Sequence, residues 1–181
     1  MTKIRKAFIF SGGRGKRLGI YKKSNVKAFA KISSKKLLLN HIENINKNLE
    51  IEKIFVIITE KKSFFEEELK NYKNIEILEN TKNYTYQGIL SGLEMIGNYV
   101  NKDEKFIIFL ADEFFEEEDF KKFCISASQI SNDENLIAIK KFDFPHEYFK
   151  NYSVLLDEKK KIILIVMKKM IKLSLIIMVL V

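Results

Sequence analysis

Four residue types are scarce in this chain of 181 residues, which has no tryptophan, one cysteine, one proline and seven glycines. The single cysteine, Cys124, excludes an internal disulfide and suits a reducing cytoplasm. With Pro145 as the only proline and no internal repeat, there is no linker to divide the chain, and one α/β domain is predicted. No charged-then-apolar signal segment opens the sequence, so we expect a cytoplasmic protein. The two histidines, His41 and His146, have no neighbours at the spacing of metal ligands.

Arginine is also scarce, with three residues against 29 lysines, yet two of the three lie in one glycine-rich loop. This loop follows the apolar run 7–10 and reads Ser11-Gly12-Gly13-Arg14-Gly15-Lys16-Arg17-Leu18. Glycine lets backbone N–H groups approach a ligand closely, and the planar guanidinium group binds phosphate oxygens in a bidentate manner. The loop is therefore predicted to bind phosphate.

Two well-known phosphate loops do not fit this sequence. The P-loop pattern G-x-x-x-x-G-K-[ST] fails because Phe10 takes the place of its first glycine and Arg17 that of its hydroxyl residue. The dinucleotide pattern G-x-G-x-x-G fails because Leu18 takes the place of its third glycine. A glycine-rich β-turn with incidental basic residues stays open as an alternative.

Apolar runs of strand length alternate with segments of helical period, which indicates a parallel sheet with crossover helices. Two of the strands are almost entirely apolar, as expected for strands covered on both faces. The predicted strands are Lys6–Ser11, Lys53–Thr59, Asn74–Glu79, Lys105–Ala111 and Leu136–Lys140. The predicted helices are Lys36–Asn48, Lys62–Asn71, Gln87–Tyr99 and Glu116–Ser131. We therefore expect a Rossmann-like, three-layer α/β/α fold.

A formal net charge of +8 favours an anionic partner, but the basic residues are interleaved with 24 acidic ones, and no nucleic-acid partner is expected. The apolar stretch 162–181 holds Lys168, Lys169 and Lys172 near its middle. Each lysine would cost roughly 2.5–3.5 kcal/mol inside a bilayer, so no membrane association is expected. Self-association into a homo-oligomer stays open.

The order of motifs resembles that of the sugar-phosphate nucleotidyltransferases, whose members include glucose-1-phosphate thymidylyltransferases and mannose-1-phosphate guanylyltransferases. In that family a strand leads into a G-G-x-G-x-R-L loop, followed by a lysine and a helix. Lys27 matches the lysine, although Val26 replaces the usual proline before it. The run 106–115 is similar to the family's strand that ends in a metal-binding aspartate, here Asp112. The resemblance extends from about Lys6 to Val166 and implies a GT-A-like fold.

The resemblance also implies the reaction, which joins a nucleoside triphosphate to a sugar 1-phosphate, giving a nucleotide-sugar and pyrophosphate. It assigns Arg17 to the leaving pyrophosphate, Lys27 to the attacking phosphate and the α-phosphate, and Asp112 to Mg²⁺. Lys168 would bind the sugar phosphate. The nucleotide would be bound by a group of loop residues, namely Ser11, Gly12, Gly13, Arg14, Gly15, Lys16, Gln87 and Gly88.

Two other readings of these residues stay open. Asp112 precedes a predicted helix, where an acid can instead cap the positive end of the helix dipole, as Glu116–Asp119 are expected to do. The acceptor could be phosphocholine or a cofactor precursor, with a cytidylyl or guanylyl group transferred, or the chain could bind nucleotide without turnover.

Beyond the paired runs 151–157 and 161–166, which are similar to a family hairpin, the sequence departs from the family. Met167-Lys168-Lys169 stands where Glu-Lys-Pro is usual, and the rest is apolar without a period. We therefore expect an incomplete nucleotidyltransferase domain over residues 1–166 and a frame-shifted or aberrant tail over 167–181, with little or no turnover.

Overall fold

The computed structural model describes residues 3–12, 26–32, 34–81, 89–131, 136–137, 152–156, 162–167 and 178–179. The chain divides into two compact units, one of residues 1–137 with 177–181 and the other of residues 138–176.

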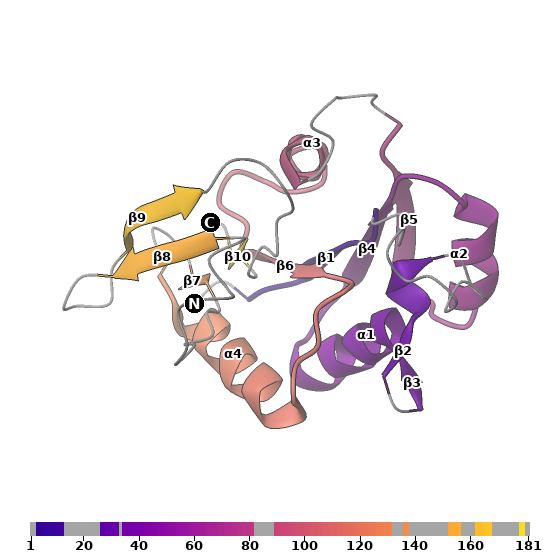
Figure 1. The fold of residues 1–181 in the computed structure, drawn as a ribbon, viewed down its shortest axis with the longest axis horizontal. Helices are drawn as coiled ribbons and strands as arrows, with labels where there is room; N and C mark the ends of the chain where they lie inside the picture. The colour runs from indigo at the N-terminus through magenta and orange to yellow at the C-terminus, as the bar shows by residue number, and fades with distance from the viewer. Residues whose placement is uncertain are drawn as a thin grey trace. The chain divides into compact units, whose positions relative to one another are not determined.

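The first unit is built on a four-stranded parallel sheet in the order β5-β4-β1-β6 (Figure 1). The strands are β1 (Lys6–Phe10), β4 (Lys53–Ile58), β5 (Ile75–Glu79) and β6 (Phe106–Leu110). The four corresponding predictions are confirmed to within one residue at each end. From β1 the chain proceeds to β4 and β5 on one side and then crosses to β6 on the other. The strand order therefore reverses at β1 and β6, and ligands of open α/β sheets bind beyond the carboxyl ends of such strands.

Helices cover both faces of this sheet, which confirms the predicted α/β fold. Figure 1 shows α1 and α4 on one face and α3 on the other, with α2 beside β5. Their bounds are α1 (Leu37–Asn48), α2 (Lys62–Leu69), α3 (Ile89–Ile96) and α4 (Glu117–Gln129). The prediction for α3 ran to Tyr99, but the helix ends at Ile96. From Asn98 on, the backbone N–H groups donate three residues back, to Met95 and Ile96, instead of four.

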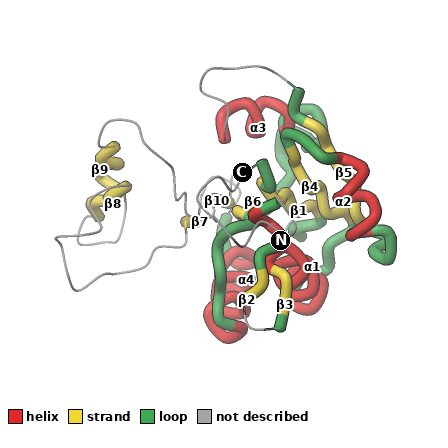
Figure 2. Tube along the Cα trace, turned by 45° about the vertical axis from the view of Figure 1, so that its right-hand side comes forward, coloured by secondary structure: helices red, strands yellow, loops and turns green. Residues whose placement is uncertain are grey.

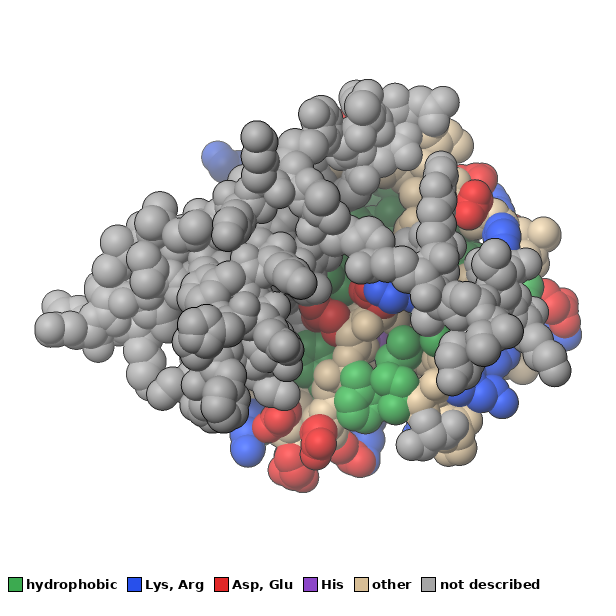
Figure 3. Space-filling model, viewed as in Figure 1, with side chains coloured by type: hydrophobic (Ala, Val, Ile, Leu, Met, Phe, Trp, Pro, Cys, Tyr) green, Lys and Arg blue, Asp and Glu red, His purple; other side chains and the backbone are tan. Residues whose placement is uncertain are grey.

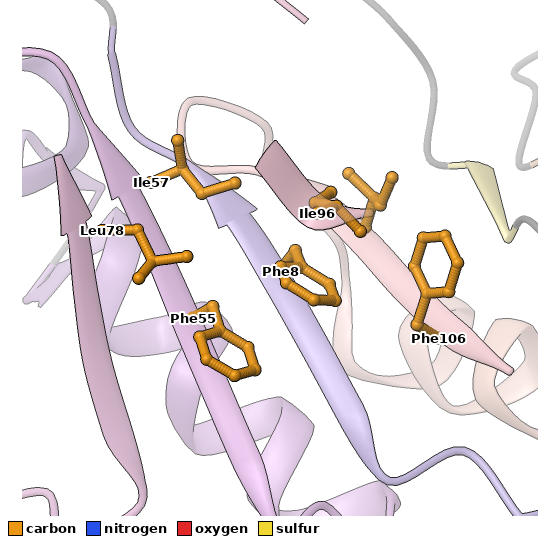
Figure 4. Close-up of a cluster of buried hydrophobic side chains, with 7 residues drawn as sticks. Phe8, Phe55, Ile57, Leu78, Ile96 and Phe106 are labelled. Atoms are coloured by element: carbon orange, nitrogen blue, oxygen red, sulfur yellow. The ribbon is translucent and has the colours of Figure 1, made fainter. Parts of the chain in front are cut away.

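One hydrophobic cluster fills the space between the sheet and α3 (Figure 4). The rings of Phe8 and Phe55 are stacked with centroids 4.9 Å apart, and Phe106 meets Phe8 edge-on at 5.6 Å. Gly92 lies so close to β1 that an added Cβ would be 1.9 Å from Cε1 of Phe10. Gly92 therefore lies at a point of close packing between α3 and β1.

On the opposite face, Phe109 of β6 stacks on Phe120 of α4 with ring centroids 5.2 Å apart. Cys124, on the same helix, is buried, and burial raises the pKa of its thiol to about 12. The Cys124 thiol is therefore protonated and unreactive at neutral pH. None of the helices in the described part of the chain is long and apolar enough to cross a membrane.

Several short elements complete the described residues (Figure 2). A 3₁₀ turn, η2 (Lys27–Phe29), leads into the small antiparallel pair β2 (Lys31–Ile32) and β3 (Lys35–Lys36), which the sequence analysis missed. In the first unit β7 (Leu136–Ile137) pairs with β10 (Met178–Val179), and residues 138–140 of the predicted strand lie outside the described residues. In the second unit β8 (Tyr152–Leu156) and β9 (Ile162–Met167) form the expected antiparallel hairpin.

Candidate active site

The glycine-rich loop begins at the carboxyl end of β1, where Ser11 continues the sheet by donating its N–H to the Ile57 carbonyl at 2.7 Å. Gly12 follows in close contact with Thr59, which comes after β4. An added Cβ at Gly12 would lie 2.9 Å from Cγ2 of Thr59, and the Thr59 hydroxyl donates to the Gly12 carbonyl at 3.2 Å. A side chain at position 12 would therefore force Thr59 to shift where the ends of β1 and β4 meet.

A small hollow opens beside these residues. It is lined by Ser11, Gly12, Val26, Thr59, Glu60, Lys61 and Phe65. The Ser11 side chain is buried, and its hydroxyl oxygen has no hydrogen-bond partner within the described structure. A buried hydroxyl without a partner costs free energy, so this oxygen is suited to a polar ligand group that enters the hollow.

The structure brings Lys27 and Asp112 together, although they are 85 residues apart in the chain. Lys27 begins η2, Asp112 follows β6, and the Lys27 ammonium group donates to Oδ2 of Asp112. The two side chains keep 35% and 38% of their surfaces exposed. A positive and a negative group, both accessible from solvent, thus face one another beyond the carboxyl end of the sheet.

Asp112 sits in a tight turn that continues β6. Ala111 donates its N–H to the Phe10 carbonyl at 3.0 Å, and Glu113 donates its N–H to the Leu110 carbonyl at 3.2 Å. The residue that precedes α4 as N-cap is Glu116, so the helix-capping reading of Asp112 is wrong. The expected acids at the positive end of the dipole are Glu117, Glu118 and Asp119, in the first turn of α4. Figure 3 shows acidic side chains gathered at the lower edge of the molecule, where α4 begins.

Glu113 has the largest pKa shift among the described carboxyl groups near the site. The sequence analysis did not single it out as a site residue. Its pKa is raised to about 7, mainly by burial and in addition by the neighbouring Asp112 carboxylate, while the Lys27 ammonium group acts in the opposite direction. Glu113 therefore holds a proton well above the pH at which an exposed glutamate loses it.

His41 of α1, which the sequence analysis left without a role, lies under the same turn. It is 1% exposed, and its Nε2 lies 2.8 Å from the Glu113 carbonyl oxygen. The ring packs against Phe109 and Phe115, with centroids 5.8 and 6.1 Å away. The sequence carried one signal of this position, because His41 interrupts an otherwise apolar buried stripe on α1.

The residues at this edge fit a magnesium ion that is held jointly by protein and substrate. The described residues contain no group of three or more histidine, cysteine, aspartate or glutamate side chains that could hold a metal alone. Mg²⁺ is usually bound through one or two carboxylates together with substrate phosphates and water. The partly exposed Asp112 carboxylate offers ligands of this kind.

The other predicted site residues lie outside the described residues. They are Gly13, Arg14, Gly15, Lys16 and Arg17 of the loop, Gln87 and Gly88 before α3, and Lys168 after β9.

We expect Gly12→Ala to weaken nucleoside triphosphate binding by roughly tenfold and to lower the melting temperature, because the new methyl group meets the Thr59 methyl group. Thr59→Ser removes that methyl group and keeps the hydroxyl. The double variant should therefore recover most of the lost affinity and stability. Calorimetry and thermal unfolding of the four proteins test this, and an unchanged Gly12→Ala protein would show that the contact is unimportant.

We expect Glu113→Gln to alter the pH dependence of stability. Between pH 4.5 and about 7, the folded parent keeps a proton on Glu113 that the unfolded chain releases. The contribution of this group to the free energy of unfolding is therefore fully present below pH 4.5 and is lost as the pH rises to about 7. Glutamine has no such loss, and at pH 7 the variant should be more stable, by on the order of 2 kcal/mol. Urea unfolding from pH 4.5 to 8 measures the difference, and parallel curves for the two proteins would contradict the expectation.

Comparison with known proteins agrees with this arrangement. The family model described as "Nucleotidyl transferase" matches residues 6–149. No curated protein matches the chain.

Solved structures with the same fold include a candidate glucose-1-phosphate thymidylyltransferase from Bacillus anthracis, with a TM-score of 0.75 and 17% identity over 97% of this chain and 71% of that one. The inositol-1-phosphate CTP transferase from T. maritima has a TM-score of 0.69 and 21% identity over 98% and 71%. The CTP:phosphocholine cytidylyltransferase from Streptococcus pneumoniae has a TM-score of 0.61 and 17% identity over 98% and 68%. Because the sequence identities are 17–21%, these structural similarities establish the fold alone.

Proposed function

The chain belongs to the nucleotidyl transferase family, and from this premise we propose that it joins a nucleoside triphosphate to a sugar 1-phosphate, forming a nucleotide-sugar and releasing pyrophosphate. The observation that carries the proposal is the pairing of Lys27 with Asp112, beyond the carboxyl ends of the strands where the sheet order reverses. The names of two neighbours, which refer to glucose 1-phosphate and inositol 1-phosphate, support an acceptor of this kind.

In this reaction an oxygen of the acceptor phosphate attacks the α-phosphorus of the triphosphate. The bond from that phosphorus to the bridging oxygen of the β-phosphate breaks, and its electron pair leaves with pyrophosphate. Both reactants are anions, so the protein contributes mainly position and positive charge. Lys27 is proposed to exchange its contact with Asp112 for the attacking phosphate and the α-phosphate. Arg17 is proposed to bind the leaving pyrophosphate.

Asp112 is proposed to hold Mg²⁺ together with the triphosphate. When bound, the ion would supply positive charge to the phosphate oxygens. The nucleotide itself is proposed to lie over the loop residues 11–16, with its base near Gln87 and Gly88, and the acceptor near Lys168. The burial of Ser11 and the tight contact at Gly12 support the first of these placements. We further propose that residues 1–166 form the catalytic domain and that the enzyme works in the cytoplasm, where a lone buried cysteine stays reduced.

The test is pyrophosphate release by the purified chain with Mg²⁺, each of the four common nucleoside triphosphates, and a set of acceptors. The set contains hexose 1-phosphates, inositol 1-phosphate and phosphocholine. Turnover with a hexose or inositol phosphate supports the proposal. Turnover with phosphocholine alone would establish the cytidylyl-type alternative, and triphosphate binding without turnover would establish a non-catalytic domain.

A further inference from the structure

His41 donates a hydrogen bond that fixes the far end of the Asp112 turn. The acceptor is the Glu113 carbonyl oxygen, 2.8 Å from Nε2. A carbonyl cannot donate, so Nε2 must carry the hydrogen atom. Burial lowers the pKa of His41, so at neutral pH the imidazole is neutral and Nδ1 is the bare nitrogen. The environment therefore selects one tautomer.

Two backbone hydrogen bonds hold this turn in addition to the histidine contact, one that joins its start to β1 and one that closes the turn across Asp112. The Ala111 N–H is held by the Phe10 carbonyl, and the Leu110 carbonyl is held by the Glu113 N–H. Asp112 lies inside the turn that the Glu113 N–H closes, directly before the residue whose carbonyl His41 holds, and its side chain contacts the Lys27 ammonium group. Without His41, the Glu113 carbonyl would lose its buried donor, and among the described residues no other hydrogen bond ties Glu113 to α1.

Packing alone does not account for a histidine at this position. Its neighbours on the buried stripe of α1 are leucine and isoleucine, which would fill the space without a polar atom. In the described structure Nδ1 is buried with no hydrogen-bond partner, a condition that costs free energy. The histidine thus brings a penalty that an apolar residue would avoid, and its one hydrogen bond is to the turn that carries Asp112.

We propose that His41 is a positioning residue for the metal-binding carboxylate: its Nε2–H holds the Glu113 carbonyl and thereby fixes the direction of Asp112. This inference rests on the proposed role of Asp112, but the tautomer and the anchoring of the turn do not depend on it.

The first test needs no variant. Nitrogen-15 spectra of the parent protein at pH 7 should show His41 as the neutral tautomer with the hydrogen on Nε2. A hydrogen on Nδ1, or a charged ring, would overturn the proposal.

The second test compares His41→Phe, which fills the space without a donor, with His41→Gln, whose Nε2 is a donor of similar reach. In His41→Phe, hydrogen exchange of the Glu113 amide should speed up by roughly tenfold, while that of the Ala111 amide stays near the parent rate. His41→Gln should restore the Glu113 rate. An equal change at both amides, or no change at Glu113, would overturn the proposal in favour of simple packing.

The third measurement is calorimetric binding of the preferred triphosphate with and without Mg²⁺. The gain in affinity from Mg²⁺ should fall by roughly tenfold in His41→Phe and return in His41→Gln. A full gain in His41→Phe would overturn the positioning role. If the parent shows no gain while the exchange results hold, the anchoring of the turn stands and the proposed metal role of Asp112 fails.

Discussion

Replacing Asp112 by asparagine is expected to lower turnover at saturating substrates by about a thousandfold, because the variant keeps the shape of the side chain but loses the charge that would hold the metal. This corresponds to about 4 kcal/mol of transition-state stabilisation. The pair with Lys27 is partly exposed, so its loss should cost the folded protein only about 0–1 kcal/mol. Pyrophosphate release and a magnesium titration of triphosphate binding measure the effect.

Asp119→Asn is the matched control, because Asp119 is also exposed and lies in the first turn of α4. It should lose a few tenths of a kcal/mol of stability through the helix dipole and keep its turnover. If Asp112→Asn behaves like this control, with full magnesium dependence, Asp112 is not a metal ligand.

Replacing Lys27 by methionine is expected to lower turnover by about a hundredfold or more. Methionine keeps much of the length of the side chain and removes the charge that would stabilise the attacking phosphate and the α-phosphate. Asp112 would lose its partner but remain exposed enough for water to solvate it. The melting temperature should therefore change little.

Lys47→Met provides the comparison for this variant. Lys47 lies on α1 and forms an exposed ion pair with Glu117. Neither residue has a proposed role in the reaction. Its turnover should equal that of the parent. Equal turnover in the two lysine variants would show that Lys27 has no role in the reaction.

The sequence was sufficient to predict the four parallel strands: β1, β4 and β6 are apolar runs that are mostly buried, and β5, which is less buried, alternates isoleucine or leucine with glutamate. It also indicated Lys27 and Asp112 separately, each through the few residues that surround it in the sequence. Their contact spans 85 residues and depends on strand order, which no local pattern specifies. A family resemblance was needed to place them in one site.

The contact of His41 with Glu113 could not be predicted for the same reason. It joins α1 to the turn after β6, 72 residues later, and a single histidine has no spacing to analyse. The raised pKa of Glu113 is likewise mainly a consequence of burial, which depends on how the helices pack around the turn and not on local sequence. The 3₁₀ turn at Lys27 was missed because three residues are too few to show a period.

The contact between Gly92 and Phe10 has a consequence for large-scale mutagenesis of this protein. Phe10 is the last residue of β1 and is followed by Ser11 and Gly12, so any side chain at position 92 must displace the ring of the residue after which the glycine-rich loop starts. In a pooled library selected for nucleotide binding, variants at position 92 should be depleted as strongly as those in the loop. A survey of tolerated substitutions would thus mark a residue of α3 as functional although the constraint on it comes from packing. Thermal unfolding of the depleted variants would show that their defect is one of packing.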